Sequence, residues 1–187
     1  MDAITALTQR VSSGKLTEPG PDQAQCELIY KAALRAADHG CLRPWRFLTV
    51  AGDDRYQLGE LYLQAGLADD PELSEARQDK FKAMPLRAPL VVVAIARCAE
   101  HPKVPREEML ISAGAGVQNM INAAFALGVG AYWRTGAMAY HSVVKQGLGI
   151  ADDEEIVGYL YLGTPKVSPR PAPELDIDDF FTPWPAK

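Results

Sequence analysis

The sequence has few of the residues that build metal sites and disulfide frameworks. Its 187 residues include three cysteines, and three histidines that lie far apart in the chain. No two cysteines form a C-x-x-C pair. The sequence therefore predicts neither a disulfide framework nor a metal site.

A surplus of basic residues is also missing. Lys and Arg together number 19 and Asp and Glu 24, which gives a formal net charge of −5. This balance argues against a nucleic-acid-binding protein, whose surface normally carries a basic patch. A hydrophobic content of 48% with 23% charged residues is typical of a globular chain. The length fits a single domain over residues 1–187.

The sequence has no clear signal for secretion or for a membrane span. Residues 1–5 show no basic stretch followed by an apolar run, so we expect no secretory signal. Residues 109–133 carry no charge and are long enough to span a bilayer. They contain the amides Gln118, Asn119 and Asn122, however, which are costly in lipid. We therefore expect a buried helix there and a cytoplasmic protein.

The usual nucleotide-binding and hydrolase motifs are absent as well. Residues 114–119 begin as G-x-G but have Asn119 in place of the third glycine, and they do not follow a strand-like segment. The chain contains neither G-x-x-x-x-G-K-[ST] nor G-x-S-x-G. A Rossmann site, a Walker site and an α/β-hydrolase nucleophile are therefore not expected.

Helical and strand-like segments do follow one another clearly along the chain. Helices are expected over 2–10, 22–37, 54–68, 72–81 and 109–128, with Asp22 as a cap and Pro71 in the first turn of the fourth helix. Strands are expected over 46–51, 90–96, 130–135 and 156–162. The run 90–96 is apolar throughout, which predicts a strand buried on both faces. The order predicts an α+β fold with a mixed sheet. The proline-rich residues 167–187 are expected to form an extended arm on another surface.

Polar residues near the N-terminus form a candidate anion site. Arg10, Ser12 and Lys15 lie together in a glycine-containing turn after the first helix. Cations and hydroxyls at this spacing can bind an anion, although a solvated helix C-terminus also favours cations. His39 follows Asp38, as in an acid–base pair, but no recognisable nucleophile stands beside it, and the alternative is a loop histidine.

In order and spacing these segments resemble the flavin-dependent nitroreductase family, which opens with R-R-S-x-R and continues with a helix, a short loop and Q-P-W-x-F. The resemblance extends from Met1 to about Lys166, and two of its segments are similar to a short branch of NAD(P)H nitroreductases within the family. Val11 stands where the family has its second arginine, and Arg43 stands where glutamine precedes Pro-Trp. The matching segments are Arg10-x-Ser12, 35–39, 44–47, 113–120, 128–136 and 157–165.

The resemblance implies a nitroreductase α+β fold, with a mixed sheet flanked by helices in an intertwined homodimer. It implies that FMN is tightly bound at the dimer interface, with Arg10 and Ser12 at the phosphate and ribityl chain and Lys15 toward the isoalloxazine ring. The resemblance further implies that FMN contacts Val11, Arg35, His39, Trp133, Arg134 and Thr135. It also implies that the nicotinamide nucleotide contacts Ala123, Ala124, Phe125, Ala126, Leu127 and Gly128.

The implied activity is that of an FMN-dependent oxidoreductase. Hydride passes from NAD(P)H to FMN, and a nitroaromatic or quinone-like acceptor is then reduced by a ping-pong mechanism. A shared site needs no Rossmann motif, and no catalytic acid, base or nucleophile is assigned. The implied partners are a small-molecule acceptor and a second copy of the chain, with no nucleic acid and no membrane. The alternatives are an FMN-binding or storage protein, another flavin reaction of the same superfamily, and an α+β interaction module that binds no flavin.

Overall fold

Strand β5 lies at the centre of a five-stranded sheet within residues 1–185, the part of the chain that the computed structural model describes. The strand order is β1-β5-β3-β2, and β4 also pairs with β5. The strands are β1 (Leu16–Thr17), β2 (Trp45–Ala51), β3 (Leu90–Arg97), β4 (Gly130–Arg134) and β5 (Glu154–Pro165).

The α+β class is confirmed, but the sheet is antiparallel where a mixed one was expected. Each pairing among the described residues joins strands of opposite direction. Strands β3 and β4 run parallel to each other, yet β5 lies between them and is antiparallel to both. The long connection from β3 to β4 therefore gives no parallel ladder within one chain.

The helices agree closely with the sequence pattern. Asp22 accepts a hydrogen bond from the Gln25 backbone N–H, and Gln25 reciprocates in a capping box. The fourth helix begins later than expected, because Ser74 and not Pro71 stands immediately before its first residue. The helices are α1 (Ala3–Thr8), α2 (Gln23–Ala33), α3 (Asp54–Asp69), α4 (Glu75–Ala83), α5 (Arg106–Ala126), α6 (Ala137–Tyr140) and α7 (Ser142–Gly147), with 3-10 turns η1 (His39–Cys41), η2 (Pro85–Arg87) and η3 (Ile177–Asp179).

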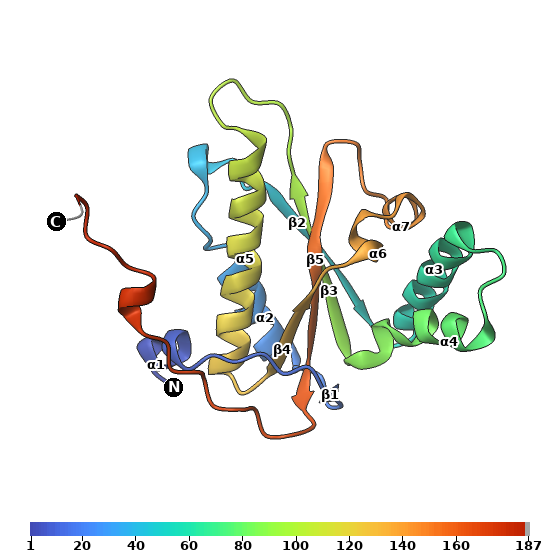
Figure 1. The fold of residues 1–187 in the computed structure, drawn as a ribbon, viewed down its shortest axis with the longest axis horizontal. Coiled ribbons are helices and arrows are strands. Elements are labelled where there is room, and N and C mark those ends of the chain that lie inside the picture. The colour runs from blue at the N-terminus through green and yellow to red at the C-terminus, as the bar shows by residue number, and fades with distance from the viewer. Residues whose placement is uncertain (186–187) are drawn as a thin grey trace.

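Helices cover both faces of the sheet (Figure 1). Successive residues of β3 point to opposite faces: Val92 packs toward α2 and α5, whereas Val91 and Val93 pack toward α3 and α7. This arrangement confirms the prediction that β3 is buried on both faces. Helix α5, which contains most of the long uncharged segment of the sequence, lies beside α2 along one face of the sheet. Within residues 1–185, no helix combines the length and apolar character that crossing a membrane requires.

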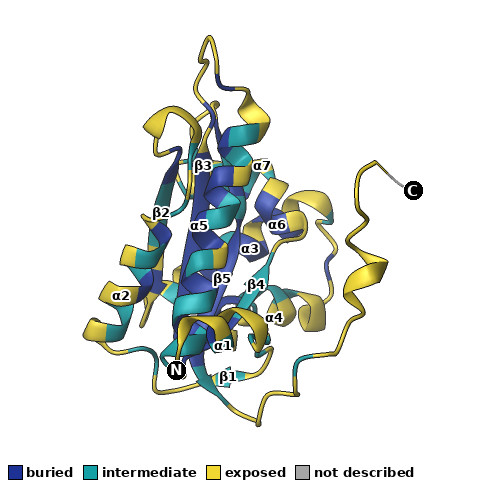
Figure 2. Cartoon of the chain, turned by 90° about the vertical axis from the view of Figure 1, so that its left-hand side faces the viewer, coloured by how far each residue is buried: buried dark blue, intermediate teal, exposed yellow. Residues whose placement is uncertain are grey.

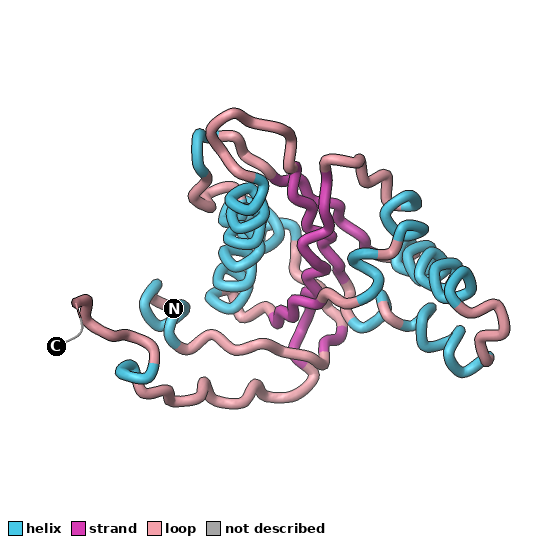
Figure 3. Tube along the Cα trace, turned by 45° about the horizontal axis from the view of Figure 1, so that its top comes forward, coloured by secondary structure: helices cyan, strands magenta, loops and turns pink. Residues whose placement is uncertain are grey.

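The C-terminal segment is extended as far as it is described. After β5 the chain runs past the N-terminal segment and away from the sheet, with η3 as its one short helical turn (Figure 3). Its surface is almost entirely exposed (Figure 2), and Phe181 and Trp184 expose 73% and 94% of their surface. The last two residues of the predicted arm lie outside the described residues.

Candidate functional site

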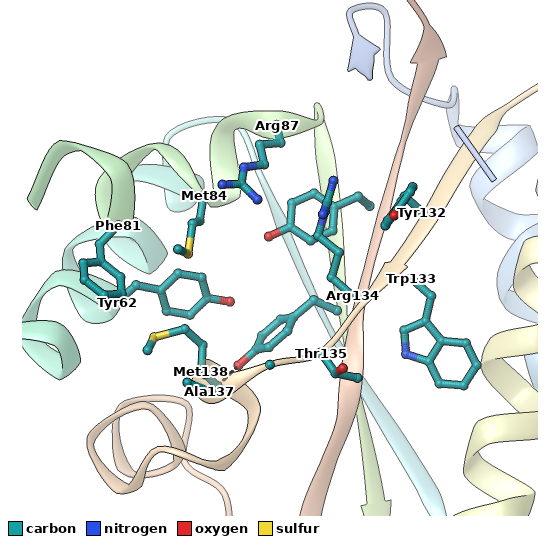
Figure 4. Close-up of a pocket in the computed structure, with 13 residues that line it drawn as sticks. Tyr62, Phe81, Met84, Arg87, Tyr132, Trp133, Arg134, Thr135, Ala137 and Met138 are labelled. Carbon is teal, nitrogen blue, oxygen red and sulfur yellow. Dashed lines mark hydrogen bonds between the residues drawn. The ribbon is translucent and has the colours of Figure 1, made fainter. Parts of the chain in front are cut away.

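A cavity of about 440 Å³ opens where β4 and β5 meet the layer formed by α3, α4 and α6 (Figure 4). Aromatic and thioether side chains make up most of its wall, and two arginines contribute charge. The lining residues are Tyr62, Phe81, Met84, Arg87, Tyr132, Trp133, Arg134, Thr135, Gly136, Ala137, Met138, Tyr159 and Tyr161.

Strand β4 brings three predicted cofactor residues to this cavity, but the strand alternation points them to different sides. The Trp133 indole lies toward α5 and donates from Nε1 to the Val157 carbonyl at 3.3 Å. Arg134 points into the cavity, where its guanidinium carbon lies 4.1 Å from the centre of the Tyr132 ring. Thr135 follows at the exposed end of the strand. Of the three, Arg134 therefore has the side chain best placed to meet a ligand here.

Two buried donors at the cavity lack a hydrogen-bond partner among the described residues. They are the hydroxyl of Tyr62 and Nε of Arg134. Tyr62 exposes 2% of its surface, and its hydroxyl points toward the cavity centre. Burial raises the pKa of Tyr62, so the hydroxyl stays protonated and can donate. An unpaired buried donor costs about 1–3 kcal/mol, so this pair favours a ligand with acceptor atoms.

The cavity is also positively charged. No Asp or Glu lines it, and neither Arg87 nor Arg134 forms a salt bridge within residues 1–185. Burial raises the pKa of Tyr161, and the charges of Arg87 and Arg134 oppose that rise. Two cations, aromatic walls and unpaired donors suit a planar ligand with electron-rich oxygens.

A second cleft, of about 380 Å³, separates the N-terminal segment from the start of the arm. Ser12 and Lys15 line one side, and Arg170 lies on the other. Arg10 donates from Nη1 to Ser12 Oγ at 3.4 Å, and the arm is held in place by the Lys166 backbone N–H, which donates to the Lys15 carbonyl at 2.9 Å. Ser12 and Lys15 thus line one cationic cleft, with Arg10 bonded to Ser12 beside it, and this cleft has the chemistry of a phosphate site. Val11 lines it too.

Gly14 connects the cleft to the cavity. The adjacent Ser13 backbone N–H donates to the Ala131 carbonyl at 2.9 Å, which fixes the N-terminal segment along β4. A Cβ at Gly14 would lie 3.1 Å from Cε2 of Tyr132, a residue of the cavity wall. Because Gly14 has no side chain, the N-terminal segment can pack closely against Tyr132. The cationic cleft lies on one side of this contact and the aromatic cavity on the other.

Arg35 and His39 lie elsewhere in the chain. Helix α2 runs antiparallel to α5, with Gln25 bonded to the Leu127 carbonyl and Asn119 bonded to the Ala32 carbonyl. His39 Nδ1 lies 2.6 Å from Glu108 Oε2, in the first turn of α5. Glu108 and Phe125, which borders the N-terminal segment, are separated by 17 residues, or about 25 Å of helix. One chain therefore does not bring His39 beside Arg10.

The predicted nicotinamide residues form the end of α5 and the turn after it. Ala124 is completely buried in the core between α5 and the sheet. Phe125 and Gly128 border a cavity of about 270 Å³ together with Val11 and Ser13. This cavity adjoins the cationic cleft, so two of the six residues are open to a ligand next to the predicted anion site.

Sequence reasoning missed Arg170, Arg87 and Tyr62. Arg170 belongs to the arm, and the whole arm was expected to lie on another surface. Instead, the path of residues 165–170 brings Arg170 to the same cleft as Ser12. Arg87 and Tyr62 come from elements with no motif of their own. The one available signal was compositional, because Arg87 stands between two hydrophobic segments where a charge is unexpected.

The chain belongs to the nitroreductase family. The family model described as "Nitroreductase family" matches residues 7–164, which include every strand except the last residue of β5. This match confirms the family assignment made from the sequence motifs.

Individual relatives and structures agree with this assignment. The chain is 39% identical over 170 residues to "Putative NAD(P)H nitroreductase YdjA" of Escherichia coli (strain K12), covering 89% of this chain and 90% of that protein. The crystal structure of a nitroreductase-like family protein from Bacillus cereus superposes with a TM-score of 0.81 at 20% identity, covering 97% of this chain and 95% of that one. The FMN and NADPH-dependent nitroreductase NfnB from Sphigopyxis sp. strain HMH superposes with a TM-score of 0.74 at 19% identity, covering 97% and 98%.

Proposed function

We propose that this chain is an FMN-dependent oxidoreductase that takes a hydride from NAD(P)H and reduces a nitroaromatic or quinone-like acceptor. The observation that carries the proposal is the pairing of a cationic cleft with an aromatic cavity that holds unpaired donors. FMN has a phosphate at one end and a planar ring with carbonyl oxygens at the other, so its two ends match the two sites. The names of NfnB and YdjA agree with this cofactor and this electron donor.

The residues present fit the two ends of FMN. Arg10 and Ser12, with Arg170 of the arm, would hold the phosphate through charge-assisted hydrogen bonds, and Lys15, from the same cleft, would extend toward the ring. Arg134 and Thr135 would face the ring, where Nε of Arg134 would find the partner that it lacks within the chain. When bound, FMN supplies the hydride-accepting chemistry, and the protein supplies binding, orientation and charge.

The roles proposed for Arg35 and His39 require a second copy of the chain. A two-fold dimer that packs α5 against its copy would bring His39 of one chain toward the N-terminal cleft of the other. Ile111, on the outer face of α5, exposes 71% of its surface, which suits such packing. The site would then be complete only in the homodimer.

Donor and acceptor would use the cavity in turn. The described residues offer one cavity of suitable size next to Arg134, so we propose a ping-pong cycle in which NAD(P)+ leaves before the acceptor enters. Phe125 and Gly128 would contact the nicotinamide nucleotide from the side of the cleft. No side chain of the cavity is assigned as catalytic acid, base or nucleophile.

Anaerobic reduction followed by steady-state kinetics tests this function. NAD(P)H alone should bleach the visible absorbance of the bound flavin, and a nitroaromatic or quinone should restore it. Initial rates measured against NAD(P)H at several acceptor concentrations should give parallel double-reciprocal lines.

Three other results would each contradict a different part of the proposed function. Intersecting lines would mean that donor and acceptor bind together. A flavin that neither NADH nor NADPH bleaches would favour the binding or storage protein. A colourless protein that fails to take up added FMN would favour an interaction module.

A further inference from the structure

The aromatic cavity contains a charged corner in which Arg87, a residue without a part in the proposed binding of FMN, lies with Arg134. Arg87 comes from η2, immediately after α4, and Arg134 comes from β4. The charges of both arginines act on Tyr161, another residue of the cavity wall. Tyr62 of α3 adds its unpaired hydroxyl from the opposite wall. Three separate elements thus direct donors toward one space.

The local structure holds this corner in place. Pro85 at the start of η2 is almost fully buried, which anchors the turn that carries Arg87. Arg134 lies against two tyrosine rings, with its guanidinium carbon 4.1 Å from the centre of Tyr132 and 5.5 Å from the centre of Tyr161. The Tyr62 and Tyr159 rings meet edge to face, with centres 5.7 Å apart. Arg134 and Tyr62 are therefore positioned before any ligand arrives, while Arg87 is an exposed side chain on an anchored turn.

A corner of this kind binds a negatively charged ligand more tightly than a neutral one. Hydride transfer brings two electrons and one proton to FMN as NAD(P)H becomes NAD(P)+, so the ring gains one negative charge. Aromatic walls exclude water and strengthen the attraction of a fixed cation for that charge. Arg87 and Arg134 therefore favour the reduced ring, while the neutral Tyr62 hydroxyl can donate to an oxygen of either form.

We propose that Arg87, together with Arg134, makes this protein bind reduced FMN more tightly than oxidised FMN, while Tyr62 binds the ring in both redox states. The proposal rests on the proposed function and adds positioning residues to that same site. It differs from the role implied for Lys15, because Lys15 lines the phosphate cleft and Arg87 lines the cavity.

The midpoint potential of the bound flavin measures this preference directly. In Arg87→Gln, the ratio of the affinities for reduced and oxidised FMN should fall about tenfold, which lowers the two-electron potential by about 30 mV. Arg87→Lys should recover most of the loss because it keeps the charge. Tyr62→Phe should weaken the binding of oxidised FMN, measured by flavin fluorescence, while moving the potential less.

Lys80→Gln is the matched control. Lys80 is an exposed cation on α4 that does not line the cavity, so its loss changes the net charge equally and should leave the potential unchanged. A potential in Arg87→Gln that equals that of Lys80→Gln would overturn the proposal. It would also be overturned if Arg87→Gln raised KM only for anionic acceptors such as 4-nitrobenzoate, since the corner would then serve the acceptor. In either case a wild-type flavin that NAD(P)H still bleaches would leave the proposed function standing.

Discussion

Arg46 shows how one residue of a recognisable motif serves the fold. Arg46 belongs to the Pro-Trp-Arg-Phe segment. It donates from Nε to the Glu154 carboxylate at 2.6 Å and from Nη2 to the Gly149 carbonyl at 2.9 Å. Arg97 adds a longer bond at 3.3 Å. The Glu154 side chain is 7% exposed, so this ion pair is largely shielded from water. The arginine of the motif therefore ties β2 to the start of β5 and is not directed at the aromatic cavity.

This ion pair predicts a loss of stability in acid. The Arg46 hydrogen bond lowers the pKa of Glu154 from 4.5 to about 2, although burial opposes the shift. A carboxylate with a lowered folded-state pKa stabilises the fold above its unfolded value and loses that contribution as the pH falls from about 4.5 toward 2. The full contribution is about 3 kcal/mol.

Glu154→Gln should therefore lower the free energy of unfolding at pH 7 by about 3 kcal/mol, because it leaves the partly buried Arg46 without its counter-charge. It should also flatten the dependence of that free energy on pH between 5 and 3. Urea unfolding at both ends of that interval measures both effects. Glu60→Gln, which removes an exposed partner of Lys82, should change stability by less than about 1 kcal/mol. Equal losses in the two variants would show that burial adds nothing to the Glu154 pair.

Strand β5 contains an irregularity that shapes the candidate site. Its register against β3 shifts between Ala94 and Ile95, which leaves Val157 unpaired on β5. The next residue, Gly158, has φ of +152°, and a Cβ there would lie 2.2 Å from Nε1 of Trp133. The bulge thus makes room for the Trp133 indole, which bonds to the freed Val157 carbonyl. This directs Trp133 toward α5 and leaves Arg134 on the cavity side.

Gly158→Ala should consequently destabilise the protein by about 2–4 kcal/mol, through backbone strain and a clash with Trp133 together. The tryptophan emission should shift as the indole is displaced, and flavin affinity should fall. Gly52→Ala separates the two causes, because Gly52 also has a positive φ but nothing lies within 4 Å of a Cβ there. If both variants lost the same stability, strain alone would explain the effect.

At the scale of the whole molecule, one face carries exposed apolar side chains that a single chain does not cover. They belong to α1, α2, α5 and the arm, all on the same side of the sheet (Figure 1). The face includes Ile4, Leu7, Leu28, Leu34, Ile111, Phe180, Phe181 and Trp184. Large exposed apolar side chains on elements that share one side of the sheet are typical of an interface between subunits.

We expect a stable dimer of about twice 20 kDa in sedimentation velocity. Ile111→Asp should shift it toward monomer and release FMN, because Arg35 and His39 would no longer reach the cleft of the other copy. Tyr56→Asp removes another large exposed side chain from α3, on the opposite face, and should leave both the dimer and the flavin intact. A monomer that retained FMN would contradict the composite site.

Much of the fold follows from the sequence alone. The apolar run 90–96 predicts the central strand, and Asp22 marks the start of α2, because such signals depend on residues a few positions apart. Arg10, Ser12 and Lys15 could be grouped for the same reason. Motif order likewise predicted the family, which the match over residues 7–164 confirms.

Tertiary structure decided the composition of the site and the direction of its side chains. Arg170 reaches Ser12 because of the path of the arm, and Tyr62 meets Arg134 across the cavity although 72 residues separate them in the chain. The bulge at Val157 determines which way Trp133 points, and the antiparallel α2–α5 pair separates His39 from Arg10. Local patterns carry no information about such contacts, since each depends on how distant elements pack and on which buried donors remain unpaired.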